Sequence, residues 1–384
     1  MPLQLRRERL ALNYVLQLQS NPNNPAYNCV FNPHFETLFN SKPNVIPTPG
    51  IRFKRLIADA GISINHIAKV NLPATPLWLL KTCSFLYTLQ DLGKKSETPP
   101  DLFINKYNEI RNDLKDFIAI FTDGSKCGPL VAAAALSAPL TLCTRLPDNS
   151  SIFSAETQAI SLALDIIESS TNTRFVIFSD SLSCLQAIEN RLWNNPLILS
   201  ILNRLHNLNM KGCNILFVWL PSHVGIRGNV EADMAAKSAL TLTAASNTCV
   251  PFSDFKPLIT TFVNKKWQRK WDLELNNKLH TIQPKVGLFI SSNCLTRRDE
   301  RVLHRLRIGH THLTHGYLLK NEDPPECIAC HSRLTAEHIL ISCSDFDHIR
   351  SQFYNVSTMS ELFHTVTPDT IVKFIKEIGL YYKI

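Results

Sequence analysis

The sequence is poor in glycine and in long apolar runs. It has 12 Gly against 22 Pro in 384 residues, which excludes glycine-based fibrous repeats and glycine-built phosphate loops. The most apolar stretch, 72–89, is interrupted by Pro73, Pro76 and Lys81, so we expect no membrane span. Residues 1–9 lack the apolar core of a secretory signal. We therefore expect an intracellular protein, cytoplasmic or nuclear, rather than a secreted one.

Charged residues are also scarce, at 19% against 45% apolar residues, which favours folded domains over disorder. The length suits two or three domains. Eleven cysteines, an odd number scattered along the chain, do not suggest a disulfide framework. Clustered Cys and His residues are therefore examined first as metal ligands.

The net charge of +8 lies in the two flanks, and residues 116–245 are slightly acidic. An acidic centre between basic flanks suggests a cation site within a nucleic-acid-binding chain. Ordinary variation of surface charge is the alternative, and charge alone does not separate the two.

Hydrophobic patterning divides the chain into three parts. Residues 1–112 read as helices separated by loops rich in Pro and Asn, and residues 250–384 as short helices with a Cys/His cluster. Between them, 114–243 alternates strands and helices, which predicts an α/β domain with a mixed five-stranded sheet flanked by helices. The expected strands are 117–123, 130–138, 140–145, 175–180 and 215–220. We expect one helix with Ser154 as its N-cap, and further helices that begin at Ser181, Leu197 and Arg227.

Four carboxylates fall where this domain can bring them together. Asp123 and Asp180 each end an apolar strand, and parallel neighbouring strands place such ends side by side. Glu156 leads an apolar helical stripe, and Asp233 lies among alanines on the last helix. Each acid alone is more often a turn, cap or helix-dipole residue. Four converging acids suit two Mg²⁺ or Mn²⁺ ions about 3.5–4 Å apart, which activate water against a phosphodiester.

His223 stands ten residues before Asp233, in a loop with two glycines. A histidine there can pass a proton to the leaving group, because its pKa lies near neutrality. A solvated loop histidine is the plainer interpretation.

The order TDGS (122–125), AE (155–156), SDS (179–181) and His223 through Asn229 to Asp233 resembles the type 1 ribonuclease H domain, over residues 114–243. The resemblance implies that Asp123, Glu156, Asp180 and Asp233 bind metal and that His223 assists. Ser125 and Asn229 would hold the nucleic-acid strands or the site. The implied reaction is cleavage of the RNA strand of an RNA–DNA hybrid.

Cys327, Cys330, His338 and Cys343 have the spacing C-x2-C-x7-H-x4-C. Three thiolates and an imidazole can close a tetrahedral zinc site. Buried structural cysteines are the alternative, and His331 is a competing ligand. Upstream, Arg301 and Arg305 belong to a run of arginines at helical spacing, which suits phosphate contacts or a solvated charged face equally well.

Residues 305–319 (RLRIGHTHLTHGYLL) and the Cys/His cluster resemble the C-terminus of polyproteins of non-long-terminal-repeat retrotransposons. Residues 3–12 resemble the segment that follows the polymerase palm in those polyproteins. The resemblance implies that 1–112 is a reverse-transcriptase thumb-like remnant. No YxDD polymerase motif is present.

Three functions stay open at this point. The first is an active hybrid ribonuclease, which the intact acids favour. The second is a catalytically silent nucleic-acid-binding remnant, which a shortened turn at 126–129 favours. The third is an integrase-like DNA-processing enzyme, against which the fourth acid and the histidine loop argue. The expected partner is RNA–DNA hybrid, and protein partners are unknown.

Overall fold

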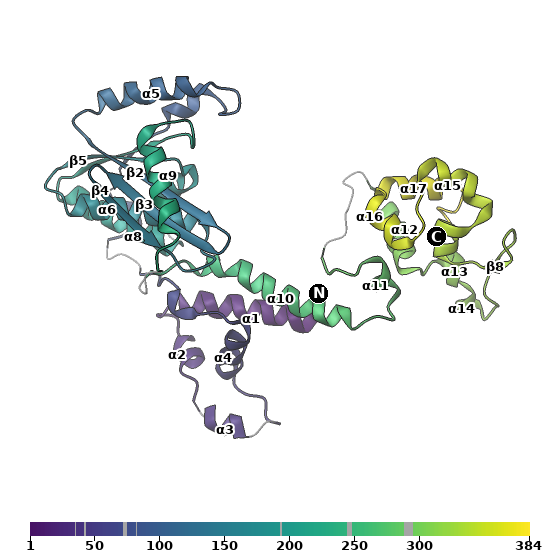
Figure 1. The fold of residues 1–384 in the computed structure, drawn as a ribbon. Coiled ribbons are helices and arrows are strands. Elements are labelled where there is room, and N and C mark those ends of the chain that lie inside the picture. Colours follow the sequence, from purple (N-terminus) through teal and green to yellow (C-terminus); the bar gives the residue numbers. More distant parts are fainter. Residues whose placement is uncertain are drawn as a thin grey trace. The chain divides into compact units, whose positions relative to one another are not determined.

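The computed structural model describes residues 1–34, 36–41, 44–71, 75–81, 83–192, 194–243, 248–287 and 295–384. The chain divides into two compact units (Figure 1). One is Arg6–Phe262, and the other joins Met1–Leu5 to Val263–Ile384. Every helix in the described ranges is too short or too polar to cross a bilayer.

A six-stranded mixed sheet forms the centre of the first unit, in the order β1-β6-β5-β2-β3-β4. β2 pairs antiparallel with β3, and β3 with β4, while β2, β5, β6 and β1 run parallel to one another. The predicted mixed sheet is confirmed, with one strand more than expected. The strands are β1 (Ser84–Leu86), β2 (Ile118–Cys127), β3 (Leu130–Ser137), β4 (Leu140–Arg145), β5 (Arg174–Ser179) and β6 (Asn214–Trp219).

Side chains alternate between the two faces of the sheet, because successive residues of a strand point to opposite sides. One face carries Phe121, Phe178 and Val218 in a core shared with α5 (Pro100–Asp113) and α9 (Arg227–Ala239). The other face packs against three further helices: α6 (Ile152–Glu168), α7 (Leu182–Glu189) and α8 (Pro196–Met210). Figure 1 labels α6 and α8 beside the sheet.

Helix α6 begins three residues earlier than predicted. The Ser151 hydroxyl accepts the backbone N–H of Ser154 at 3.1 Å, so Ser151 is the N-cap and Ser154 lies inside the first turn. The prediction of Ser154 as the cap was wrong because both serines satisfy the same sequence signal. The predicted apolar stripe is buried as expected: Ala159, Ile160, Ala163, Leu164 and Ile167.

The N-terminal part of the chain contributes to the sheet core. Leu89 in η3 (Thr88–Leu92), with Phe103 and Ile110 in α5, is buried among the sheet residues of one face. The predicted boundaries at 112 and 114 stay a prediction, and the compact unit runs across them. The elements before β1 are α1 (Leu3–Gln19), α2 (Tyr27–Phe31), α3 (Glu36–Ser41), α4 (Pro49–Ala60), η1 (Ile64–His66) and η2 (Leu77–Leu79).

The second unit has its own hydrophobic core, in which Leu306, Leu340 and Phe374 are fully buried. After η4 (Phe252–Phe255) and α10 (Lys256–Asp272), its elements are α11 (Lys278–Ile282), α12 (Arg297–Ile308), α13 (His312–His315), α14 (Tyr317–Lys320), the hairpin β7 (Glu326–Cys327) and β8 (Ser332–Arg333), η5 (His338–Ser342), η6 (Ser344–Phe346), α15 (Asp347–Phe353), α16 (Met359–Thr365) and α17 (Pro368–Glu377).

Gly228 allows α9 to lie directly on the sheet. A Cβ at this position would meet the ring of Phe121 at 2.3 Å. That ring cannot move aside freely, because it stacks on Phe178 with 5.0 Å between centroids. A side chain at position 228 would therefore push α9, and with it Asp233, away from the sheet.

Gly228→Ala should lower the free energy of unfolding by about 1–3 kcal/mol, the usual cost of overpacking a core. The measurement is urea unfolding followed by circular dichroism. Gly287→Ala is the control, because a Cβ there has no described atom within 4 Å; it should change stability by less than about 0.5 kcal/mol. Equal stability of Gly228→Ala and wild type would contradict this packing.

Candidate active site and metal centres

Three of the four predicted acids meet where β2 and β5 lie side by side. One carboxylate oxygen from each of Asp123, Glu156 and Asp180 lies within 4.8 Å of the other two. The strands bring the aspartates together, because Thr122 pairs in register with Ser179, one residue before each. Asp123 is not at the end of its strand as predicted. β2 continues to Cys127, since residues 124–127 pair with β3 in a hairpin that forms despite its short turn.

Glycine at position 124 is required by the close approach of α6. A Cβ on Gly124 would lie 2.7 Å from the backbone nitrogen of Glu156 and 2.9 Å from the Cβ of Ala155. The Asp-Gly pair of the TDGS motif therefore does two things. Asp123 supplies a carboxylate, and Gly124 lets the helix bring Glu156 next to it.

Burial and mutual repulsion raise the pKa of each of these three carboxyls. Burial raises the pKa of Asp123 to about 8, helped by the charges of Asp180 and Asp233. The pKa of Glu156 is raised well above its usual range by burial, then by Asp180 and Asp123, against a hydrogen bond from the Gly124 backbone. Burial also raises the pKa of Asp180. Two ionised carboxylates 4.8 Å apart repel by about 3 kcal/mol at an effective dielectric constant near 20.

The donor set of this cluster fits a hard divalent cation. The side chains of Asp123 and Glu156 are 6% and 9% exposed, and Glu156 Oε2 is buried with no hydrogen-bond partner in the described structure. A buried, unpartnered carboxylate oxygen costs free energy unless a cation or proton satisfies it. All three donors are oxygens, which suits Mg²⁺ or Mn²⁺ rather than zinc.

Asp233, the fourth predicted acid, lies near the cluster but outside it. Its charge raises the pKa of both Asp123 and Asp180. Its Oδ2 is held by Lys237 Nζ at 2.7 Å, one turn further along α9. The structure thus brings together three of the four acids and shows the fourth paired with a lysine.

His223 lies in the loop between β6 and α9, exposed, with a left-handed φ of 53°. The charge of His223 lowers the pKa of Asp180. Asn229 is buried, and its Nδ2 lies 3.5 Å from Asp180 Oδ2, so it steadies the site itself. Ser125 is also buried, on β2 two residues beyond Asp123.

Sequence reasoning missed two residues that act on this site. Lys237 neutralises Asp233, and its i, i+4 spacing from an aspartate on an exposed helix face was an available signal. Trp219 donates its indole N–H to the backbone oxygen of Asp180 at 3.2 Å. Its position at the end of β6, level with Ser179, gave no signal without the register of the sheet.

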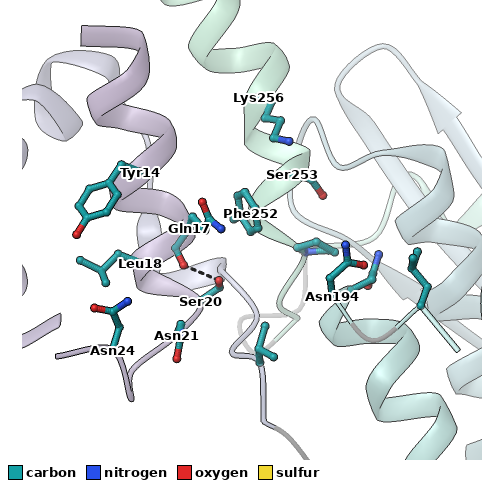
Figure 2. A pocket seen from close by; sticks show the side chains of 14 residues that line it. Tyr14, Gln17, Leu18, Ser20, Asn21, Asn24, Asn194, Phe252, Ser253 and Lys256 are labelled. Carbon is teal, nitrogen blue, oxygen red and sulfur yellow. Dashed lines mark hydrogen bonds between the residues drawn. The ribbon is translucent and has the colours of Figure 1, made fainter. Parts of the chain in front are cut away.

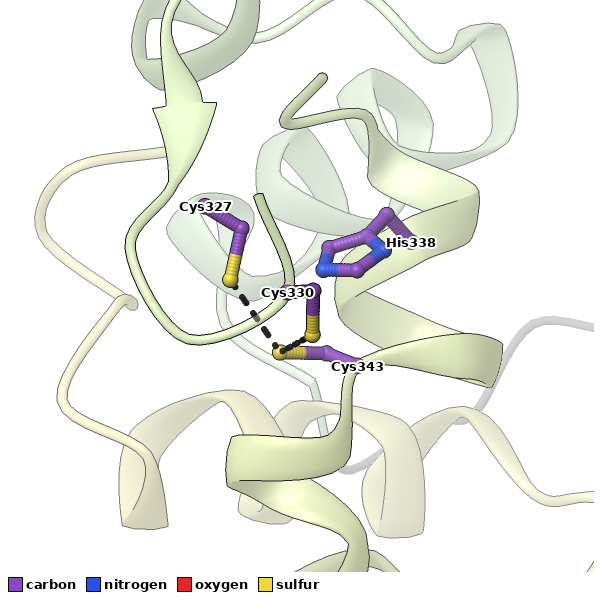
Figure 3. A group of neighbouring side chains, drawn as sticks. All are labelled: Cys327, Cys330, His338 and Cys343. Atoms are coloured by element: carbon purple, nitrogen blue, oxygen red, sulfur yellow. Dashed lines mark hydrogen bonds between the residues drawn. The ribbon is translucent and has the colours of Figure 1, made fainter. Parts of the chain in front are cut away.

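The second predicted cluster also assembles. Figure 3 shows the sulfurs of Cys327, Cys330 and Cys343 and the ring of His338 pointing toward a common centre, and one donor atom of each lies within 4.8 Å of the others. Cys343 Sγ is 3.7 Å from Cys327 Sγ and 3.9 Å from Cys330 Sγ. Thiolates about 2.3 Å from a tetrahedral zinc ion lie roughly 3.8 Å apart, so the spacing fits zinc.

The surroundings of this cluster favour metal binding over simple burial. His338 Nε2 is buried without a described partner, while Ser332 and Ser342 hydroxyls lie 3.5 and 3.4 Å from Nδ1. Hydrogen bonds from the hydroxyl and backbone N–H of Ser344 lower the pKa of Cys330 to about 7, so its thiolate is available at neutral pH. The competing candidate His331 is exposed and outside the cluster.

The arginines of α12 are partly used inside the second unit. Arg305 donates from Nη1 to the backbone oxygen of Ile384 at 2.6 Å. Arg298 lies over the ring of Tyr382, with 4.4 Å from Cζ to the centroid. Arg301 is exposed on the same helix. In the phosphate-binding face proposed from the sequence, all the guanidinium donors of Arg301 are therefore accessible. For Arg305, only the donors that are not bonded to Ile384 are accessible.

One protein-family model matches the part of the chain that contains the carboxylate cluster. The family model described as RNase H matches residues 115–241, and with the strand order it makes this part of the chain an RNase H-like domain. No curated protein matches the chain. Among solved structures, the chain is similar to RNase H1 from the halophilic archaeon Halobacterium salinarum NRC-1, at 19% identity and a TM-score of 0.25, over 32% of this chain and 96% of that one.

The raised pKa of Asp123 predicts how pH acts on the metal-free protein. An unfolded aspartate has a pKa near 3.9, so the folded state holds the extra proton between pH ~4 and the folded pKa of about 8. The contribution of Asp123 to the free energy of unfolding therefore falls as pH rises from ~4 to about 8. Asp123→Asn should remove the loss, and in EDTA at pH 8 its Tm should exceed that of wild type by about 2–4 °C.

Thermal unfolding at pH 6 and pH 8, with EDTA or with Mg²⁺, makes this measurement. Mg²⁺ should stabilise wild type more at pH 8 than at pH 6, because protons compete with the cation. The matched control is Asp116→Asn, which removes an exposed carboxylate of the same unit and should behave as wild type. Identical pH profiles for all three proteins would contradict the assignment.

The tail cluster predicts about one zinc per chain, measured by mass spectrometry of metals after gel filtration. Cys330→Ser should lower the zinc content severalfold and leave the first unit folded. Cys127→Ser, which removes an exposed cysteine outside the cluster, should not change it. Full zinc occupancy in Cys327→Ser/Cys343→Ser, which keeps only two of the four ligands, would refute the site.

Proposed function

We propose that this chain is a metal-dependent endoribonuclease that cuts the RNA strand of RNA–DNA hybrids. The observation that carries the proposal is the trio of buried Asp123 and Glu156 with half-buried Asp180, whose oxygens lie within 4.8 Å of one another inside an RNase H-like domain. The proposed cofactor is Mg²⁺ or Mn²⁺, as two ions held by these residues, with Asp233 completing the set.

The chain's own groups have separate tasks in this proposal. Bound divalent cations would activate a water and stabilise the leaving oxygen of the phosphodiester. Asp123, Glu156 and Asp180 hold the charge that the cations require and fix their positions. Asn229 restrains Asp180 through the contact at 3.5 Å. His223, which is exposed on the loop between β6 and α9, would give a proton to the leaving group.

Selectivity for RNA would come from recognition of 2′-hydroxyls in the minor groove of the hybrid, which a DNA strand does not offer. Ser125 and Asn229 are buried next to the carboxylates, so we propose that they act on the scissile strand through the site rather than as broad surface contacts. Arg301, and Arg305 with its remaining donors, would add phosphate contacts from the second unit.

A catalytically silent nucleic-acid-binding protein is the second candidate. The observation that favours it is the pairing of Asp233 with Lys237 at 2.7 Å, which uses the charge of the fourth acid. The exposed lysine is able to leave when a cation arrives, since an exposed ion pair contributes roughly 1 kcal/mol or less. We therefore place the active enzyme first. The integrase-like alternative has less support, since the matching family model is RNase H.

We also propose that the chain derives from a retrotransposon polyprotein and works inside the cell. The support is the resemblance of segments 3–12 and 305–319 to such polyproteins and the reducing environment that free cysteines and a zinc site need. This context would supply hybrid substrate during reverse transcription.

Labelled RNA–DNA hybrid incubated with Mg²⁺ tests the activity. Wild type should cut the RNA strand, stop with EDTA, and spare both duplex DNA and the DNA strand of the hybrid. Asp123→Asn and Asp180→Asn should lower the rate by orders of magnitude while hybrid binding persists. His223→Ala should cost on the order of 10²-fold, because it removes proton transfer and keeps the metal ligands.

Undiminished cutting by Asp123→Asn, or equal cutting of duplex DNA, would defeat the proposed mechanism. A folded wild type that binds hybrid and never cuts it would select the silent protein instead. Lys237→Gln separates the two further. It should rescue activity in a protein silenced by the Asp233 pair and should leave an already active enzyme within a fewfold of wild type.

A further inference from the structure

A groove in the first unit shares no residue with the carboxylate cluster. It consists of a cavity of about 600 Å³ and an adjoining shallower one of about 510 Å³. The two share Gln17, Phe252 and Lys256, so they form one continuous surface. The larger volume falls within the range of about 300–1,000 Å³ usual for ligand pockets, which is enough for about one or two nucleotides.

Four parts of the chain that are far apart in the sequence line this groove, one of them at Val70. Figure 2 shows Tyr14, Gln17 and Leu18 of α1 on one side, with Phe252 and Lys256 opposite them. The remaining wall includes the turn after α1 and the loop that leads into α8. The helical N-terminal segment and the RNase H-like domain thus build the groove jointly.

Side-chain amides give the groove its hydrogen-bonding capacity. Three exposed residues line the groove with their amides: Gln17, Asn21 and Asn194. None of the hydrogen bonds described in the structure involves these side-chain amides. Asn195 differs, because its Oδ1 caps α8 by accepting the backbone N–H of Leu197 at 2.9 Å. Free amides present a donor and an acceptor side by side, which matches the edges of nucleic-acid bases.

An aromatic ring and two cations accompany the amides. Phe252 lies half-buried in the shared part of the groove, with Lys256 Nζ 5.5 Å from its ring centroid. Tyr14 is exposed in the larger cavity, and Arg9 lines the shallower one. Rings that stack on bases beside cations that contact phosphates are the features of single-strand binding surfaces.

The groove also has no acidic lining among the described residues, although the chain has 32 Asp and Glu. Asp254 lies in the same wall segment, but its Oδ2 accepts the backbone N–H of Ser151 at 2.8 Å and it is buried. Among the described residues that line the groove, no carboxylate therefore lies beside Arg9 and Lys256.

We propose that this groove binds a single-stranded stretch of nucleic acid, with a base on Phe252 and phosphates near Lys256 and Arg9. The proposal rests on the proposed ribonuclease function, which it deepens by naming a substrate class. The preferred substrate is a hybrid with a single-stranded extension, rather than a blunt hybrid.

Fluorescence anisotropy in EDTA, which prevents cutting, tests the groove on the full chain. The probes are a blunt RNA–DNA hybrid and the same hybrid with an extension of about ten nucleotides, made as RNA in one arm and DNA in the other. The extension should tighten binding by on the order of 10-fold, since one stacked base contributes about 1–3 kcal/mol. The type of extension, RNA or DNA, that gives the larger gain in affinity identifies the kind of strand that the groove binds.

Three variants test whether the groove provides this gain in affinity. Phe252→Leu keeps apolar volume and removes the stacking face, Lys256→Gln removes a charge, and Gln17→Ala removes an amide from an exposed helix position without harming the helix. Phe252→Leu and Lys256→Gln should each lose most of the gain, Gln17→Ala a smaller part, and all should keep blunt-hybrid affinity. Lys256→Gln should also reduce the salt slope for the extended probe by about 0.7.

Lys211→Gln is the charge-matched control, because Lys211 is an exposed lysine of the same unit outside both cavities; it should behave as wild type. An extension that adds no affinity, or a gain that survives in all three groove variants, overturns the inference. Cleavage of the blunt hybrid in Mg²⁺ tests the proposed function separately. Intact cleavage without extension binding refutes only the groove, and extension binding without cleavage refutes only the ribonuclease.

Discussion

Mutual repulsion among Asp123, Glu156 and Asp180 is the constraint on which the rest of the first unit depends. Their oxygens lie within 4.8 Å of one another at a buried position, and burial raises the pKa of all three. No fold gains stability from such an arrangement. The cluster makes physical sense as a place where cations supply the missing charge, and the surrounding structure supplies the stability that the cluster does not.

The sheet and its helices hold the acids in place through backbone geometry. Parallel pairing of β2 and β5 sets Asp123 beside Asp180, and two glycines remove the side chains that would keep the helices away. Gly124 leaves room for α6, which carries Glu156, to approach β2. Gly228 lets α9, which carries Asp233, pack against the ring of Phe121. Within the cluster Asp123 and Glu156 are buried and Asp180 is half-buried, whereas His223, on the loop between β6 and α9, is exposed.

The second unit has its own cluster of candidate metal ligands beside its hydrophobic core. Its thiols and His338 lie at spacings that suit one tetrahedral ion, and Ser344 makes one thiol acidic enough to bind at neutral pH. Two of its arginines, Arg305 and Arg298, contact the C-terminal residues, and Arg301 stays exposed.

The sequence predicted the parts of the site that depend on local pattern. Apolar strands ending near Asp123 and Asp180, and cysteines at metal-binding spacing, are visible in one dimension. The strand β1 was missed because three residues are too few to show alternation. The N-cap was misplaced because Ser151 and Ser154 both fit the signal. Lys237, Trp219 and the groove around Phe252 depend on register and on contacts between distant segments, which composition and periodicity do not contain.

Proton release on cation binding tests the central claim most directly, because it links the raised pKa values to metal binding. Calorimetric titration of the metal-free chain with Mg²⁺, in buffers of different ionisation enthalpy, measures the protons released. Roughly one proton or more per chain should leave at pH 7, and the number should fall by pH 9 as Asp123 ionises by itself. Binding of Mg²⁺ with no proton release at pH 7, or no binding at all, would contradict this account of the site.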